Sequence, residues 1–110
     1  MIASRSDASG SEKPDILTNI VAQVLSAGAI EFEVEYKDEN EEICVMRGPI
    51  GFGIASLPSS SDEAKELRAQ LYGLKKKRRM IVVDGVDYLL RVEIFDSFGE
   101  DAFRVTVTPA

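Results

Sequence analysis

Residues 30–37 read IEFEVEYK, the strictest alternation of apolar and charged side chains in the chain. Successive side chains of a β-strand point to opposite faces. The stretch therefore predicts a half-buried strand with an apolar face (Ile30, Phe32, Val34, Tyr36) and a charged face (Glu31, Glu33, Glu35, Lys37). Residues 38–41 (DENE) predict a turn. Residues 42–47 are sufficiently apolar to form a second strand that runs back along the first. The two segments predict an antiparallel hairpin.

A helix is predicted immediately before this hairpin. Pro14 suits a first helical position because its missing N–H costs nothing there. The apolar side chains that follow recur at helical spacing (Ile16, Leu17, Ile20, Val21, Val24, Leu25), and Gly28 suits a left-handed residue after the helix. Residues 1–13 contain few apolar side chains, so we expect a flexible tail there.

The middle of the chain predicts a break and then a second helix. Residues 48–53 (GPIGFG) are expected to interrupt regular structure, and a short third strand over residues 52–57 is left open. Ser60 and Glu63 have the spacing of a helix capping box. Leu67 and Leu71 lie on the apolar stripe of the helix that follows, so we expect them to face the sheet.

The C-terminal third predicts three further strands. Asp84-Gly85 between apolar runs is a strong hairpin signal, so residues 80–83 and 86–95 form a predicted pair. A turn over residues 97–101 leads to a last strand ending near residue 108. Together, residues 14–108 predict one α+β domain. Its two helices pack on one face of a mainly antiparallel sheet of five to six strands.

The composition excludes several functions. The 110 residues carry a net charge of −6, which opposes nucleic-acid binding because phosphate contacts need a basic surface. Histidine is absent, which removes the commonest general base and metal ligand. We therefore expect no enzyme activity, no catalytic residues, no metal and no cofactor. No apolar run has transmembrane length and no apolar segment of a signal peptide follows Met1, so we expect a cytoplasmic protein.

Two charged segments are candidate partner-binding surfaces. The first is the row Glu31, Glu33 and Glu35, which a strand would hold on one face. The second is the basic run at the end of the second helix: Lys75, Lys76, Lys77, Arg78 and Arg79. Either segment also fits a solvated surface, and we favour the acidic row. Cys44, between Ile43 and Val45, is predicted to be a buried or half-buried strand residue and not a nucleophile.

The order of these elements resembles two families. Residues 16–107 resemble the N-terminal domain of type II secretion and type IV pilus assembly ATPases, through residues 27–31 (AGAIE), Asp84-Gly85, Arg91-Val92, Gly99-Glu100 and Arg104. The family's ATPase core and Walker motif are missing, so this resemblance implies an adaptor and not a motor. The second resemblance is to the small acidic homodimeric chaperones of type III secretion. Their order of elements is similar: a helix, three strands, a helix and further strands. That family continues with a C-terminal helix, for which no pattern follows Val107.

These observations favour a non-enzymatic protein-binding or adaptor module. One version is related to the secretion ATPase domain, and another is a chaperone-like homodimer that binds a protein segment. The alternative from another class is a small-ligand-binding domain, with a pocket between helices and sheet bordered by Gly48–Gly53. That pocket would not exist if Phe32, Phe52, Leu67 and Leu71 filled the space.

Overall fold

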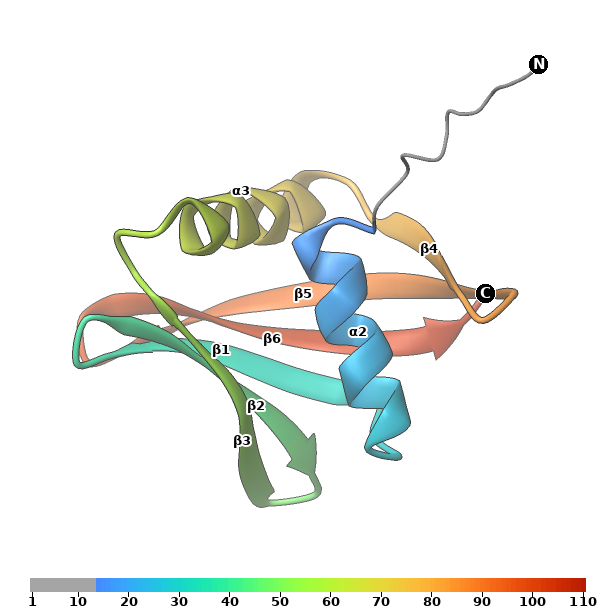
Figure 1. Ribbon diagram of the computed structural model, residues 1–110, viewed down its shortest axis with the longest axis horizontal. Helices are drawn as coiled ribbons and strands as arrows, with labels where there is room; N and C mark the ends of the chain where they lie inside the picture. Colours follow the sequence, from blue (N-terminus) through green and yellow to red (C-terminus); the bar gives the residue numbers. More distant parts are fainter. Residues whose placement is uncertain (1–13) are drawn as a thin grey trace.

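The computed structural model describes residues 14–110, so the tail expected over residues 1–13 lies outside the described part. Its elements are α2 (Ile16–Ser26), β1 (Glu31–Lys37), β2 (Asn40–Arg47), β3 (Ile50–Pro58), α3 (Asp62–Lys76), β4 (Arg79–Val83), β5 (Val86–Ser97) and β6 (Glu100–Pro109). The six strands form one antiparallel sheet in the order β3-β2-β1-β6-β5-β4. Figure 1 shows this curved sheet with α2 and α3 packed against it. The predicted α+β fold is confirmed.

The core lies between the helices and one face of the sheet. It consists mainly of the apolar stripes of α2 and α3 and the alternate residues of the central strands (Leu17, Val21, Val24, Phe32, Val34, Ile43, Val45, Leu67, Leu71, Phe103, Val105, Val107). Leu67 and Leu71 are fully buried, so the predicted orientation of the second helix is confirmed. The opposite face of the sheet carries the charged residues of β1, and neither helix of residues 14–110 covers it (Figure 1).

The start of α2 lies two residues after the predicted one. Asp15 is the N-cap, and its carboxylate accepts a hydrogen bond from the Thr18 N–H at 2.9 Å. Pro14 therefore precedes the cap and is not the first helical residue, because an aspartate side chain can satisfy a free N–H and proline cannot. Arg79, at the start of β4, donates a hydrogen bond to the other carboxylate oxygen of Asp15. Gly28 has a φ of +76°, as expected of a left-handed residue after a helix.

We expect Asp15 to make folding stability depend on pH. Partial burial opposes its ionisation, but hydrogen bonds from Thr18 and the Arg79 guanidinium outweigh burial and lower the pKa of Asp15. A lowered pKa gives stabilisation that is complete above the unfolded value of about 3.8 and is lost as the pH falls through the folded value. Asp15→Ala should therefore cost about 0.5–2 kcal/mol at pH 7 and less near pH 2.5.

Urea unfolding between pH 7 and pH 2.5 measures this difference. Asp15→Asn is the matched control, since asparagine also caps helices but cannot pair with Arg79 as an anion. It should retain more stability than Asp15→Ala at pH 7. A loss for Asp15→Ala that stays constant across the pH range would show that the carboxylate charge contributes nothing.

The third strand is longer than the sequence predicts. Only Gly48 and Pro49 form a turn, with Gly48 at a φ of +64°, and Ile50–Pro58 then pairs with β2 along its length. The expectation that residues 48–53 interrupt regular structure is therefore wrong. Gly51 and Gly53 lie in extended backbone, which the neighbouring strand stabilises despite their low strand propensity. A register shift between Ile43 and Cys44 marks a β-bulge in this pair.

Two other boundaries also differ by a few residues. Ser61, and not Ser60, caps α3, because its hydroxyl accepts a hydrogen bond from the Ala64 N–H at 3.1 Å. The predicted turn over residues 97–101 contracts to Phe98-Gly99, where both φ angles are positive. The strands β5 and β6 are therefore longer than expected. Their pairing runs from Tyr88, which is opposite Pro109, to Ser97, which is opposite Glu100.

Candidate protein-binding surfaces

The helical layer covers only part of the edge strand β3: Ile54, Ala55 and Leu57 pack against the core, whereas the start of the strand is exposed. Phe32 on β1, Val45 on β2 and Phe52 on β3 are directly opposite one another across the sheet, on the face that the helices cover. Their exposed fractions are 0%, 1% and 53%. Ile50, two residues before Phe52 on the same face, is 57% exposed. The apolar face of the sheet therefore continues beyond the helices as an uncovered surface on β3.

The backbone of β3 is also available at its outer edge. In the part of the chain that the structure describes, β3 pairs with β2 on one side and with no strand on the other. A two-residue turn makes Arg47 and Ile50 a hydrogen-bonded pair, and such pairs alternate along an antiparallel ladder. Gly51 and Gly53 thus fall at the alternate positions, with their N–H and C=O groups directed to the free edge.

An open hollow lies beside this edge. It has a volume of about 570 Å³ and is lined by Ala22, Gln23, Ser26, Ala27 and Ile54. Alanine and serine on this side of α2 leave the space that larger side chains would fill. The hollow is shallow and open to solvent along the side of α2 that faces Ile54 of β3.

The sequence of β3 has only part of the usual protection of an edge strand. Natural edge strands are commonly short, charged, bulged or interrupted by proline. Ile50–Pro58 has nine residues and no charged side chain, with its bulge in the middle and its proline at the end. The opposite edge strand β4 has five residues and begins with Arg79. Of the two edges of the sheet, β3 is the one suited to pair with another strand.

The acidic row is present on β1, but two of its three carboxylates already have partners. Glu33 forms an ion pair with Arg104 at 2.7 Å, and the hydrogen bond that Arg104 donates to Glu33 raises the pKa of Arg104. Glu35 accepts a hydrogen bond from the Ser97 hydroxyl at 2.8 Å. The row therefore presents less free negative charge than the sequence suggests, and its role in binding stays a prediction.

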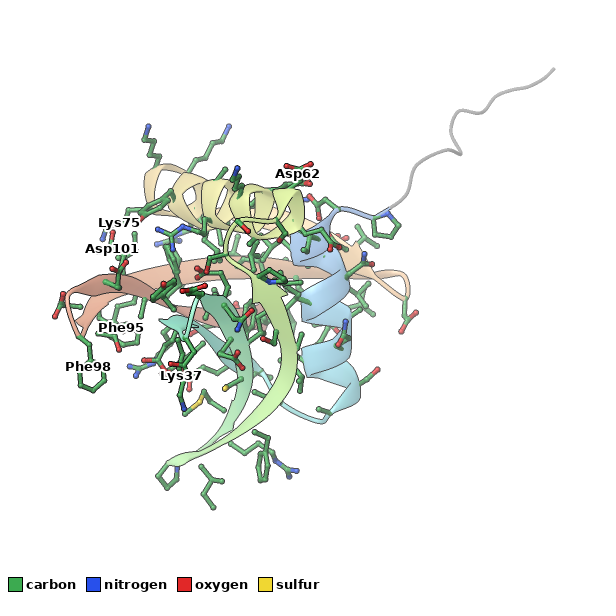
Figure 2. The ribbon with its side chains drawn as sticks, turned by 60° about the vertical axis from the view of Figure 1, so that its left-hand side comes forward. Lys37, Asp62, Lys75, Phe95, Phe98 and Asp101 are labelled. Carbon is green, nitrogen blue, oxygen red and sulfur yellow. The ribbon has the colours of Figure 1, made fainter. Side chains whose placement is uncertain are left out.

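The basic run divides between different surroundings. Lys75 and Lys76 lie in the last turn of α3, Lys77 is its C-cap, and Arg78 is exposed. Arg79 forms an ion pair with Asp15 at the start of α2, so it has a structural role in joining β4 to that helix. Figure 2 shows Lys75 at the opposite end of α3 from Asp62. Lys75, Lys76 and Arg78 line one hollow, whereas Arg79 does not, so the five residues do not form one continuous surface.

Glu41 was expected in the turn over residues 38–41, but β2 begins at Asn40 and places Glu41 in the sheet. Its exposed fraction is 1%, and it accepts hydrogen bonds from the Ser59 hydroxyl at 2.9 Å and the Arg68 guanidinium at 3.4 Å. Among residues 14–110, no group of three or more carboxylate or cysteine side chains is arranged to hold a metal ion. Glu41 therefore has a structural role between β2 and α3.

Cys44 is half-buried on the charged face of the sheet, as expected. Burial, together with Glu35, Glu42 and Glu33, raises the pKa of its thiol. The thiolate is the reactive form of cysteine, so this environment disfavours nucleophilic chemistry.

The space between helices and sheet is largely occupied. Phe32, Leu67 and Leu71 fill it and are fully buried, whereas Phe52 lies outside it on the exposed part of β3. Three of the four side chains expected to close a ligand pocket therefore do so. The fourth, with Ile50, forms an exposed apolar surface that the sequence analysis missed. The uncharged stretch IGFGI at residues 50–54 was the available signal.

Comparison with protein-family models gave no match, and comparison with curated proteins gave no significant match. Within residues 14–110, neither helix has the length and apolar character needed to cross a membrane.

Proposed function

We propose that this protein is a non-enzymatic protein-binding module that takes up an extended segment of another protein along the free edge of β3. The observation that carries this proposal is the uncovered apolar row on an unpaired strand edge, with Phe52 about half exposed beside fully buried neighbours. Proteins bind extended peptides in this way through main-chain hydrogen bonds and alternate side-chain contacts.

The proposal specifies the chemistry of the bound segment. Its backbone pairs with the N–H and C=O groups of Gly51 and Gly53. Alternate side chains are apolar, because they extend the row of Val45 and Phe52 and enter the hollow between α2 and β3. The other side chains are small or polar, since they lie beside the glycines on the open face of the sheet. Because β3 has no charged side chain, the ends of the bound segment can carry either positive or negative charge.

A random dodecapeptide library displayed on phage tests the proposal. Peptides selected on the immobilised protein should have apolar residues at alternate positions, and their affinity is measured by fluorescence polarisation. Phe52→Lys should weaken binding roughly tenfold or more, because it places a charge where an apolar contact forms. Gly53→Pro should have a similar effect, since it removes an N–H from the free edge.

Val82→Lys is the matched control. Val82 lies on the opposite edge strand and is 60% exposed, so the same charge is added to a comparable apolar position. Peptide affinity should not change. Selected peptides that tolerate Phe52→Lys and Gly53→Pro but lose affinity when Glu31, Glu33 and Glu35 are changed to lysine would refute the proposal in favour of the acidic row. Melting curves verify that each variant remains folded.

A second candidate is a chaperone-like homodimer that binds a protein segment. The element order, a helix, three strands, a helix and three strands, supports the resemblance to type III secretion chaperones. Sedimentation equilibrium distinguishes the candidates. A dimer that Phe52→Lys and Gly53→Pro dissociate would mean that a second copy of this chain occupies the β3 edge. A monomer that binds the selected peptides favours the adaptor module.

A further inference from the structure

Four basic residues line one hollow at the end of α3. The hollow has a volume of about 320 Å³ and is lined by Leu74, Lys75, Lys76, Arg78, Arg91 and Val92. Leu74 is buried and Val92 is half-buried, so they form an apolar base beneath the charged groups. Every charged residue in the lining is basic, although acidic residues outnumber basic ones in the chain by 19 to 13.

The helix dipole explains only part of this arrangement. Cations in the last turn of a helix are stabilised by its negative end, which accounts for Lys75 and Lys76. Arg78 follows the helix, and Arg91 comes from the middle of β5, thirteen positions further along the chain. Neither position is in a helical turn, so the helix dipole does not account for the two arginines; Arg91 also lines a second hollow, with Glu31 and Glu93.

Within residues 14–110, no carboxylate forms an ion pair with any of these four basic residues. Arg79 and Arg104, by contrast, are paired with carboxylates. Like charges brought together repel one another, and a hollow with an apolar base strengthens their combined field. An anion in the hollow would offset this repulsion.

We propose that this hollow binds a phosphate group, carried by a small soluble molecule or by a lipid headgroup. Two arginines and two lysines suit a dianionic phosphate better than a single carboxylate. The planar guanidinium forms paired hydrogen bonds to phosphate oxygens, and lysine adds charge from any direction. The site is on β5 and the end of α3, whereas the peptide-binding edge is β3 at the other side of the sheet. This inference is therefore independent of the proposed function.

Titration with inorganic pyrophosphate at constant ionic strength, followed by ¹H–¹⁵N correlation spectra, tests the inference. Saturable shift changes are expected at residues 74–79 and 91–92. The double variant Arg78→Gln/Arg91→Gln should raise the dissociation constant roughly tenfold or more, because two charge-assisted contacts are lost. The matched control is Arg47→Gln/Lys65→Gln, which removes the same charge from exposed positions outside the hollow. It should bind pyrophosphate as the native protein does.

Sedimentation with phosphatidylcholine vesicles, with and without phosphatidic acid, distinguishes the two sources of phosphate. Retention only on vesicles with phosphatidic acid, lost in the Arg78/Arg91 variant, would assign the site to a lipid headgroup. Saturable pyrophosphate binding without vesicle retention would assign it to a soluble compound. Shift changes that never saturate, or that are equally weakened in both double variants, would overturn the inference, because they indicate non-specific screening of charge.

Discussion

Replacing Leu71 with alanine is expected to lower the free energy of unfolding by about 2–5 kcal/mol, the usual range for a buried leucine. Leu71 is fully buried between α3 and the sheet, together with Leu67 one turn earlier. The substitution removes apolar contacts and leaves a cavity that the surrounding side chains fill incompletely. A domain of this size has about 5–15 kcal/mol of stability, so the loss is a large fraction of the total.

Urea unfolding followed by circular dichroism measures this effect. Met80→Ala is the matched control, since it also shortens an apolar side chain but at a position 57% exposed on β4. Its cost should be well below that of Leu71→Ala, because little apolar surface is buried there. Equal losses for the two variants would mean that α3 does not present Leu71 to the core.

Removing Arg68 is expected to destabilise the fold by about 2–4 kcal/mol, because it leaves the carboxylate of Glu41 buried with only the Ser59 hydroxyl as a partner. The Glu41 side chain is 2% exposed and the Arg68 side chain 30%. Arg68→Met tests the effect while keeping much of the apolar stem. The same substitution at Arg104, which pairs with Glu33 on the open face of the sheet, should cost about 1 kcal/mol or less.

A double-mutant cycle separates the pair from its surroundings. Glu41→Met combined with Arg68→Met removes both charges and should restore most of the stability lost in Arg68→Met alone. Apolar replacement of a buried ion pair is often neutral or stabilising, whereas an unpaired buried charge is costly. If the double variant is less stable than Arg68→Met, then Glu41 is not a buried charge that depends on Arg68.

The two edges of the sheet differ in a way that bears on function. The β3 edge combines apolar side chains, free backbone groups and a hollow, all without charge. The surroundings of the β4 edge are basic, through Arg78 and Arg79. A partner segment at β3 and a phosphate group beside β5 could therefore be bound at the same time without competing for one surface.

The sequence alone predicts the elements whose signals are local. The alternation of residues 30–37 is specific because a strand has a period of two. Asp84-Gly85 reliably indicates a hairpin turn and Gly28 the end of a helix, because both structures need positive φ angles, which few residue types adopt. The stripe of Leu67 and Leu71 follows from the helical period, which places them on one face. These signals are sufficient for the α+β class and for the side of each element that faces the core.

The candidate sites depended on contacts between distant segments, which a single sequence does not specify. Glu33 loses its free charge to Arg104, 71 positions away, because β6 lies next to β1 in the sheet. Glu41 is buried because Arg68 of α3 lies above it. Phe52 is exposed because the helical layer does not cover the start of β3, and Arg91 lines the basic hollow because β5 packs against α3. Local periodicity sets which face a side chain occupies, but the packing of elements decides what covers that face.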